Sequence, residues 1–366
     1  MSTKNRIFYY DALRALAIIG IVCTHVAANF AAKSYLINTN SYFLAIFFNH
    51  FRNFAVPIFV MLSGALLLNR DLPPIVFLKK RFNRVVVPLI FWTIIFGLFS
   101  IIFLHFPFSI DTFLKMFFVE EGTLGGLFWF IWMIIVVYIW IFIINKIFSF
   151  DRAKKYFSTF VKLSVIALVI YSIIVTLDLF SPPNKLVHYS QFIGYALLGY
   201  YLANTDFTKG KIANFLKLTP LKLGILSLIL FIGLYLTYIS GIIIPTSVSL
   251  HEHFSTSHFY ILLIILNSSL FLSFRYLSES NNGFIKKIES GKSAKLITSI
   301  SRHSFGIYFI HMLIIYLINI ITKYQLFTKN PMKVIPLLIV VVFLSSWFII
   351  WCIDKIPYLN KCLGTS

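Results

Sequence analysis

Residues 9–26, YYDALRALAIIGIVCTHV, decide the fold class, because this run is apolar enough to enter a bilayer and yet contains a guanidinium and an imidazole. Arg14 and His25 are eleven positions apart, and at about 100° per residue they return to within roughly 20° of the same helix face. A rise of 1.5 Å per residue separates them by about 16 Å along the axis. Inserting an arginine at membrane depth costs roughly 2.5–3.5 kcal/mol, so both side chains are expected to face a polar channel through the protein and to avoid lipid.

The composition extends this conclusion to the whole chain. Its 366 residues are 59% hydrophobic and only 12% charged, with a mean hydropathy of +0.88, whereas soluble domains have about 25% charged residues. Several other runs reach the roughly 20 apolar residues of a transmembrane helix. The sequence predicts an all-α polytopic bundle of about ten transmembrane helices in one domain, 1–366, without a fused soluble domain. The predicted spans lie near 12–32, 42–68, 85–105, 126–147, 163–180, 190–204, 223–241, 258–277, 303–323 and 333–352.

The net charge of +20 follows the predicted topology. With the N-terminus inside, 24 of the 32 Lys and Arg residues fall in inner segments and seven in outer ones, with Arg14 in the membrane. This asymmetry is the positive-inside rule, and it predicts an N-in, C-in orientation. The basic charge is therefore assigned to orientation and to contact with anionic lipid. A nucleic-acid partner is not expected.

Several segments are expected to depart from a simple membrane-spanning helix. The second span is about 27 residues long and is expected to tilt or to break near Pro57. The sixth span is short and rich in Gly and Tyr, which is typical of a helix packed closely inside a bundle. The outer gap near 106–126 is amphipathic enough to form a re-entrant or interfacial segment. The first helix is expected to be retained, because it lacks a convincing cleavage site.

No metal is expected. The cysteines, Cys23, Cys352 and Cys362, have no spacing typical of a metal site or a disulfide framework. The sequence HEHFSTSH at 251–258 is rich in histidine, but its spacing differs from HExxH. A solvated outer loop or a contact to an acceptor explains it better than zinc.

The first span supports a catalytic hypothesis and a structural alternative. In the catalytic hypothesis Asp11 orients Arg14, Arg14 holds an anionic or carbonyl-bearing group, and His25 acts as a base, since imidazole titrates near neutral pH. In the alternative, Arg14 pairs with Asp11 one turn away and anchors the helix, and His25 is a core histidine with a satisfied hydrogen bond.

Three further sites are candidates. Arg81 and Arg84, in RFNR, suit a phosphate-rich ligand because each planar guanidinium binds phosphate through two hydrogen bonds, although anchoring at the inner surface explains them as well. The ninth span, SRHSFGIYFIH at 301–311, places Ser304, Tyr308 and His311 within an apolar helix, where a histidine needs a partner. Trp129, in the fourth span, also fits an interfacial aromatic belt.

These motifs, in this order, resemble those of the acyltransferase family 3 membrane proteins. The resemblance covers nearly the whole chain, and its strongest element is an arginine, ten residues and a histidine in the first span, here Arg14 and His25. Further elements are FVMLSG, ending at Ser63 and Gly64, and SFGIYFIH, ending at His311. The arginine pair of RFNR and the WFI that begins at Trp129 also match.

The resemblance implies a multi-pass enzyme of the bacterial cytoplasmic membrane that moves acyl groups from cytoplasmic acyl-CoA to an extracytoplasmic or lipid-linked glycan. Acetyl-CoA is the expected donor. Arg81 and Arg84 would hold the CoA phosphates, the thioester would reach past Arg14, and His25 would deprotonate the acceptor hydroxyl or carry the acyl group transiently. Some members carry a fused esterase-like domain that completes the transfer. This chain is expected to have no such domain, and it is therefore expected to act alone or with a separate extracytoplasmic transferase.

Two rival interpretations remain open at this point. Intramembrane Arg and His also fit an exporter of polysaccharide or of a small organic acid, although no inverted repeat of broken helices is visible. The third interpretation is an assembly subunit of a glycan synthesis complex, in which these polar residues serve packing only.

Overall fold

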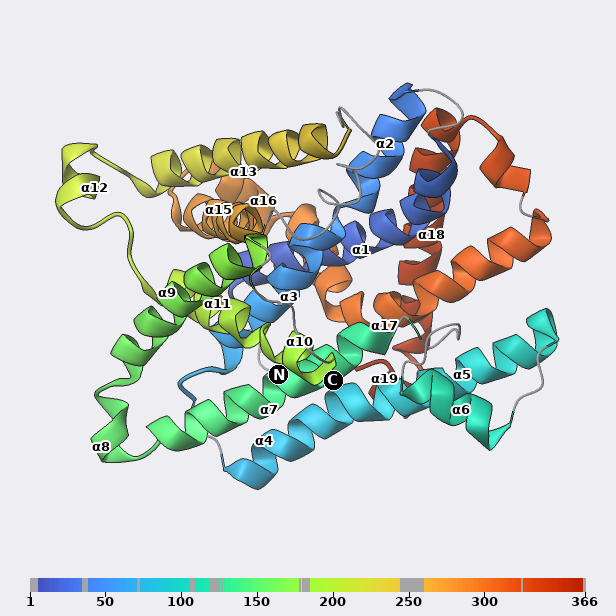
Figure 1. Ribbon diagram of the computed structural model, residues 1–366, viewed down its shortest axis with the longest axis horizontal. Helices are drawn as coiled ribbons and strands as arrows, with labels where there is room; N and C mark the ends of the chain where they lie inside the picture. Colours follow the sequence, from blue (N-terminus) through green and yellow to red (C-terminus); the bar gives the residue numbers. More distant parts are fainter. Residues whose placement is uncertain are drawn as a thin grey trace. The chain divides into compact units, whose positions relative to one another are not determined.

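The computed structural model describes residues 6–34, 39–70, 73–105, 109–118, 126, 128–177, 179, 185–243, 260–323 and 325–364. Within these residues the chain forms helices and no strands (Figure 1). Nine helical segments of this part of the chain are long and apolar enough to cross a membrane. The prediction of an all-α polytopic membrane protein is therefore confirmed. The inward orientation of the termini stays a prediction.

Seven of the nine candidate spans in the described part of the chain lie within single helices, and two combine consecutive helices. The single helices are α1 (Phe8–Ser34), α7 (Trp129–Phe148), α9 (Phe157–Thr176), α13 (Pro220–Ile243), α15 (Tyr260–Glu279), α17 (Lys292–Ile321) and α18 (Pro331–Ile353). The compound ones are α2 (Thr39–Asn49) with α3 (Arg52–Leu67), and α4 (Pro74–Arg81), η2 (Phe82–Val86) and α5 (Val87–Leu104) in sequence.

The sixth predicted span, 190–204, differs from a simple membrane helix. It corresponds to α11 (Ile193–Asn204), whose 12 residues rise about 18 Å, well short of the hydrocarbon thickness. The short helix α10 (Lys185–Ser190) precedes it after two residues. Neither helix is among the nine candidate spans of the described residues, so a membrane crossing at 190–204 stays a prediction.

The break in the second span lies earlier than the proline that suggested it. α2 ends at Asn49 and α3 begins at Arg52, so the interruption falls at His50 and Phe51. Pro57 lies inside α3 and is buried there. Because Pro57 lies in the second turn of α3, it removes the hydrogen bond that an amide at this position would donate to the Asn53 carbonyl, yet the helix continues through it.

Several short helices connect the spans. Among them α6 (Ile110–Phe117) lies in the predicted interfacial gap and begins at Ser109, whose hydroxyl accepts a hydrogen bond from the Thr112 amide. The indole of Trp132 donates to the Phe117 carbonyl at 2.7 Å and ties the end of α6 to α7. The others are α8 (Asp151–Lys154), α12 (Lys211–Phe215), α16 (Gly283–Ser290), η4 (Gln325–Thr328) and α19 (Leu359–Cys362).

The chain divides into two compact units, each assembled from segments far apart in sequence. The first unit contains the chain up to Ala17, His50–Arg70 and Ile143–Ser301. In it, α3 packs against α11 and α13 packs against α15 (Figure 1). The α3–α11 crossing depends on glycine, because a Cβ on Gly64 would lie 1.8 Å from the Ala196 carbonyl oxygen.

The second unit contains Ile18–Asn49, Asp71–Phe142 and the chain from Arg302 onward. Its interior contains stacked aromatic rings, whereas small residues form the contact between α3 and α11 in the first unit. The rings of Trp92 and Phe309 stack with centroids 5.5 Å apart and planes within 4°, and Phe128 packs against Phe309. α2 packs against α18 in the same unit. The prediction of one domain over 1–366 stays a prediction.

Candidate active site

The first cluster surrounds the carboxylate of Asp11 in the first unit. Asp11 lies in the first turn of α1 and its side chain is 4% exposed. The Arg14 guanidinium lies 3.6 Å from Asp11 Oδ1, as expected for neighbours one turn apart. Arg6 adds a second cation, whose Nη2 donates to Oδ1 at 2.9 Å and whose Nε donates to Oδ2. We call Arg6, Asp11, Arg14 and Ser301 the carboxylate cluster.

Ser301 completes the carboxylate cluster from α17. Its hydroxyl donates to Asp11 Oδ1 at 2.7 Å and accepts a hydrogen bond from Arg14 Nη1 at 3.2 Å. One hydroxyl therefore bridges the buried acid and the arginine, and it uses its donor and its acceptor at the same time. This arrangement fixes the direction of the Arg14 side chain, which keeps 19% of its surface exposed.

The second cluster is a pair of histidines in the second unit. The rings of His25, on α1, and His311, on α17, have centroids 5.2 Å apart. His311 is 1% exposed, and its Nδ1 lies 3.0 Å from the carbonyl oxygen of Ile307. Because a carbonyl oxygen only accepts, Nδ1 carries the hydrogen. In the neutral ring Nε2 then holds a lone pair.

That lone pair has no hydrogen-bond partner among the described residues. His311 Nε2 is buried and unsatisfied, which is unusual because most buried polar atoms in proteins are paired. A bare imidazole nitrogen can accept a hydrogen bond from a bound hydroxyl group. The histidine pair is therefore a candidate site for a reacting group.

Aromatic side chains surround the histidine pair. Tyr308 lies one turn before His311, with ring centroids 6.1 Å apart, and packs against Phe130 of α7 at 5.3 Å. Trp92 of α5 stacks on Phe309, two residues before His311. The Trp92 indole nitrogen is also buried and lacks a partner among the described residues. An unused N–H donor thus lies one aromatic ring away from the histidine-bearing helix.

The arginine pair lies on the same helical segment as Trp92, further toward its start. Arg81 ends α4, where its guanidinium lies over the rings of Phe77 and Tyr138 at 5.8 and 5.4 Å, respectively. Both contacts are cation–π interactions. The Arg81 Nε is buried without a partner in the described residues, whereas Arg84 is exposed.

A π-helical turn separates the arginine pair from α5. In η2 the Val87 amide bonds to the Phe82 carbonyl, five residues back. Such turns are rare and concentrate at functional sites. From Arg84 in η2 to Trp92 in α5 the helical segment advances eight residues, or about 12 Å. One continuous element therefore connects the guanidinium pair with the stack that adjoins His311.

The family model described as an acyltransferase domain, that of acyltransferase 3, matches residues 7–351. The chain belongs to the acyltransferase 3 family. It is a membrane acyltransferase, and all of the site residues predicted from the sequence lie inside the matched range. No curated protein and no solved structure matches the chain.

The remaining predicted residues of the acyltransferase are more dispersed. Ser63 lies in the first unit, where its hydroxyl donates to the Phe59 carbonyl of its own helix at 3.0 Å. Trp129 begins α7 and is partly buried, and Ser304 is buried on α17. The roles of these three residues stay predictions. The sequence 251–258 lies outside the described residues, and the described ones contain no group of three metal-ligating side chains.

Three residues that the structure places in or near these clusters were not named from the sequence. Ser301 begins the quoted run SRHSFGIYFIH, but its contact with Asp11 joins positions 290 residues apart. Trp92 lies in a span rich in aromatic residues, where nothing marks it. Asn319 is eight residues after His311 and about 80° around the helix from it, so this spacing does not mark it.

Proposed function

We propose that this acyltransferase transfers an acyl group, with acetyl as the expected one, from cytoplasmic acyl-CoA to a hydroxyl of an extracytoplasmic or lipid-linked glycan. The observation that carries the proposal is the histidine pair, in which a buried His311 nitrogen faces no hydrogen-bond donor beside His25. The family match supports the reaction class. The multi-pass fold supports a cell membrane as its site, and we propose the bacterial cytoplasmic membrane.

The donor would bind through its phosphates at the arginine pair. Arg84 is exposed, and Arg81 is held by two aromatic rings that leave hydrogen-bonding capacity unused. Guanidinium groups bind phosphate oxygens in pairs of hydrogen bonds. The thin pantetheine arm would then follow α5 toward Trp92, whose free indole N–H suits the thioester carbonyl oxygen.

Two routes of acyl transfer fit the histidine pair, and both balance. In the direct route His25 takes the proton of the acceptor hydroxyl, the oxygen attacks the thioester carbon, and the CoA thiolate leaves and takes up that proton. In the covalent route a His25 nitrogen attacks the thioester and displaces the thiolate, which takes up the imidazole proton, giving an acyl-imidazole. The acceptor oxygen then attacks the acyl carbon and passes its proton to a base, for which we propose His311 Nε2, and that proton returns to the departing His25 nitrogen.

The carboxylate cluster is proposed to position Arg14. Asp11 and Ser301 hold the partly exposed guanidinium in one direction, and its proposed role is to bind an anionic or carbonyl-bearing group. An extracytoplasmic transferase is a proposed partner for acceptors that the membrane enzyme does not reach. The contacts of Arg14 with Ser301 and Asp11 support its positioning. The class of the bound group is inferred from the chemistry of guanidinium.

The deciding experiment uses the full chain in lipid nanodiscs with acetyl-CoA labelled in the acetyl group. Wild-type protein is expected to release CoA and to transfer or hydrolyse the acetyl group. His25→Ala is expected to lower that turnover by about 10²–10⁴-fold, because it removes the general base or the acyl carrier. His50→Ala is the matched control, since His50 is also a buried membrane histidine and lies on the other unit.

Each outcome separates the interpretations. Equal turnover in His25→Ala and wild type would remove the histidine from the mechanism and favour an assembly role. Failure of the wild type to consume acetyl-CoA, with net movement of an organic acid across vesicles, would favour the exporter. Loss of turnover in the His25 variant alone, with unchanged thermal stability, supports the proposed transfer.

A further inference from the structure

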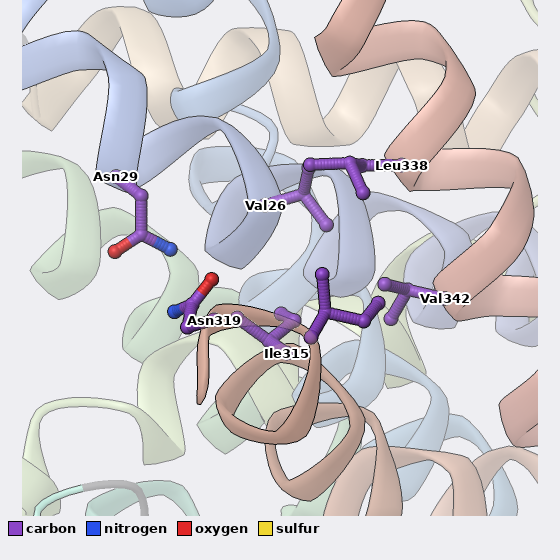
Figure 2. Close-up of a pocket in the computed structure, with 7 residues that line it drawn as sticks. Val26, Asn29, Ile315, Asn319, Leu338 and Val342 are labelled. Atoms are coloured by element: carbon purple, nitrogen blue, oxygen red, sulfur yellow. The ribbon is translucent and has the colours of Figure 1, made fainter. Parts of the chain in front are cut away.

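A small pocket lies in the second unit among α1, α17 and α18. Its wall is mostly aliphatic, and two carboxamides, those of Asn29 and Asn319, are its only polar side chains (Figure 2). In the close-up these carboxamides turn toward each other at one end, opposite Leu338 and Val342. The pocket holds a group of about the size of a water molecule.

The register of α1 and α17 places this pocket beside the histidine pair. Asn29 follows His25 by one helical turn, and its side-chain amide donates to the His25 carbonyl at 3.3 Å. Asn319 follows His311 by two turns. Because both asparagines follow their histidines, α1 and α17 run in the same direction here. The pocket begins at Val26, directly after His25, and at 1.5 Å per residue Asn29 lies about 6 Å beyond His25 along α1.

Asn319 shows that the pocket is not simply packing space. Its side chain is 6% exposed, lines the pocket, and has no hydrogen bond to any described residue. A carboxamide that lines a pocket and makes no hydrogen bond to the described residues is available to a group bound there, which an apolar side chain would not be. The unpaired donor and acceptor therefore await a ligand that supplies both.

We propose that the Asn29–Asn319 pocket binds an uncharged hydroxyl group of the acceptor, such as a hydroxymethyl end, and so orients the acceptor toward the histidine pair. This inference rests on the proposed acyl transfer. A hydroxyl donates and accepts, as a carboxamide does, and it matches the pocket in size. The lining contains no charged side chain, which disfavours a carboxylate or a phosphate at this position.

The test measures how the acetyl group divides between two acceptors. Protein in nanodiscs is given labelled acetyl-CoA with glycerol, which is a minimal uncharged hydroxymethyl compound, and the ratio of acetylglycerol to acetate is recorded. Both products derive from the same acyl donor, so the ratio does not depend on the fraction of active protein. Sodium glycerate, which replaces one hydroxymethyl group by a carboxylate, is the charged probe.

Asn29→Leu and Asn319→Leu are each expected to lower the ratio about five- to tenfold, the effect of losing one hydrogen bond to the acceptor. Glycerate is expected to receive less acetyl than glycerol in the wild type. Asn204→Leu is the matched control for Asn29, because Asn204 is an exposed helical asparagine whose amide likewise donates to the carbonyl four residues back. It is expected to keep the wild-type ratio.

The outcomes distinguish this inference from the function on which it rests. An unchanged ratio in both pocket variants, or a wild type that hydrolyses acetyl-CoA without acylating glycerol, would overturn the acceptor pocket and leave the acyltransferase function standing. A pocket that only holds a structural water would alter thermal stability and not the ratio, which also overturns it. A wild type that does not consume acetyl-CoA would overturn both.

Discussion

The carboxylate cluster and the histidine pair meet the same physical problem in opposite ways. Each places polar side chains of α1 at membrane depth, one near the start of the helix and one later. Every partner needed by Asp11 is present, with two guanidiniums and a hydroxyl around one carboxylate. In the histidine pair, by contrast, one nitrogen of His311 is bonded and the other is not.

The contrast separates a supporting site from a reacting one. Buried charge is tolerated when its hydrogen bonds are complete, and the completed network then resists change. A buried nitrogen without a partner costs free energy, and such a cost persists where the atom is needed for something other than stability. We therefore expect changes in the carboxylate cluster to act on stability first and changes near the histidine pair to act on turnover first.

The largest expected effect is that of His311→Leu. This substitution removes the unpaired Nε2 and replaces the imidazole by an apolar side chain of similar size. Turnover of labelled acetyl-CoA is expected to fall about 10²–10⁴-fold, as for loss of an acid–base group. The midpoint of thermal unfolding in detergent is expected to stay or to rise, because no satisfied partner is lost from Nε2. A marked fall in that midpoint would show that His311 stabilises the fold, as the carboxylate cluster is expected to do, and would contradict the proposed difference between the two sites.

Trp92→Phe tests whether the second unpaired donor belongs to the reacting region. The phenyl ring preserves stacking on Phe309, while the indole N–H is removed. Loss of one donor to a developing oxyanion lowers turnover by about 10²-fold. Steady-state kinetics with acetyl-CoA are expected to show this in kcat more than in KM. A change confined to KM would place Trp92 in donor binding and not in transfer.

Asp11→Asn is the corresponding test of the carboxylate cluster. It removes the negative charge and leaves the partly buried Arg14 guanidinium without its counter-charge. Breaking a buried pair from one side costs about 3 kcal/mol. Thermal and denaturant unfolding in detergent would measure that loss, and Arg14 would then need the remaining hydroxyl of Ser301 to hold its direction. Wild-type stability in this variant would mean that the cluster does not support the fold.

The sequence predicted the fold class because hydropathy and span length are local properties. It also predicted that Asp11 and Arg14 interact, because residues three apart on a helix are neighbours. A break in the second span was expected near Pro57, whereas the interruption lies at His50 and Phe51, and the π-turn at Phe82–Val86 was not predicted. Both depend on how neighbouring helices pack, which a single span does not encode.

The composition of each cluster was only half predictable for the same reason. His25 and His311 were each selected as polar residues in apolar helices, but their contact joins α1 to α17 across nearly the whole chain. Ser301 was overlooked because a serine in a helix has many unremarkable roles. Its importance arises only from the carboxylate and the guanidinium on either side of its hydroxyl.

Ser301→Ala is expected to have a smaller effect than the loss of the acid. The variant removes one donor to Asp11 and one acceptor for Arg14, while the ion pair remains. The expected loss of unfolding free energy is about 1 kcal/mol. Ser304→Ala, three residues further on the same helix, is a suitable comparison because it has the same change in size. Equal losses in both variants would mean that the Ser301 bridge contributes nothing of its own.

The smallest expected effect belongs to Arg6, although it makes two hydrogen bonds to the same carboxylate. Its side chain is 45% exposed, so water and salt screen the pair. Arg6→Gln is expected to cost about 0.5 kcal/mol or less in unfolding free energy, and that cost is expected to shrink as salt is added. The measurement is thermal unfolding at low and high salt. A salt-independent loss as large as that of Asp11→Asn would mean that the exposed cation, and not Arg14 with Ser301, compensates the buried charge.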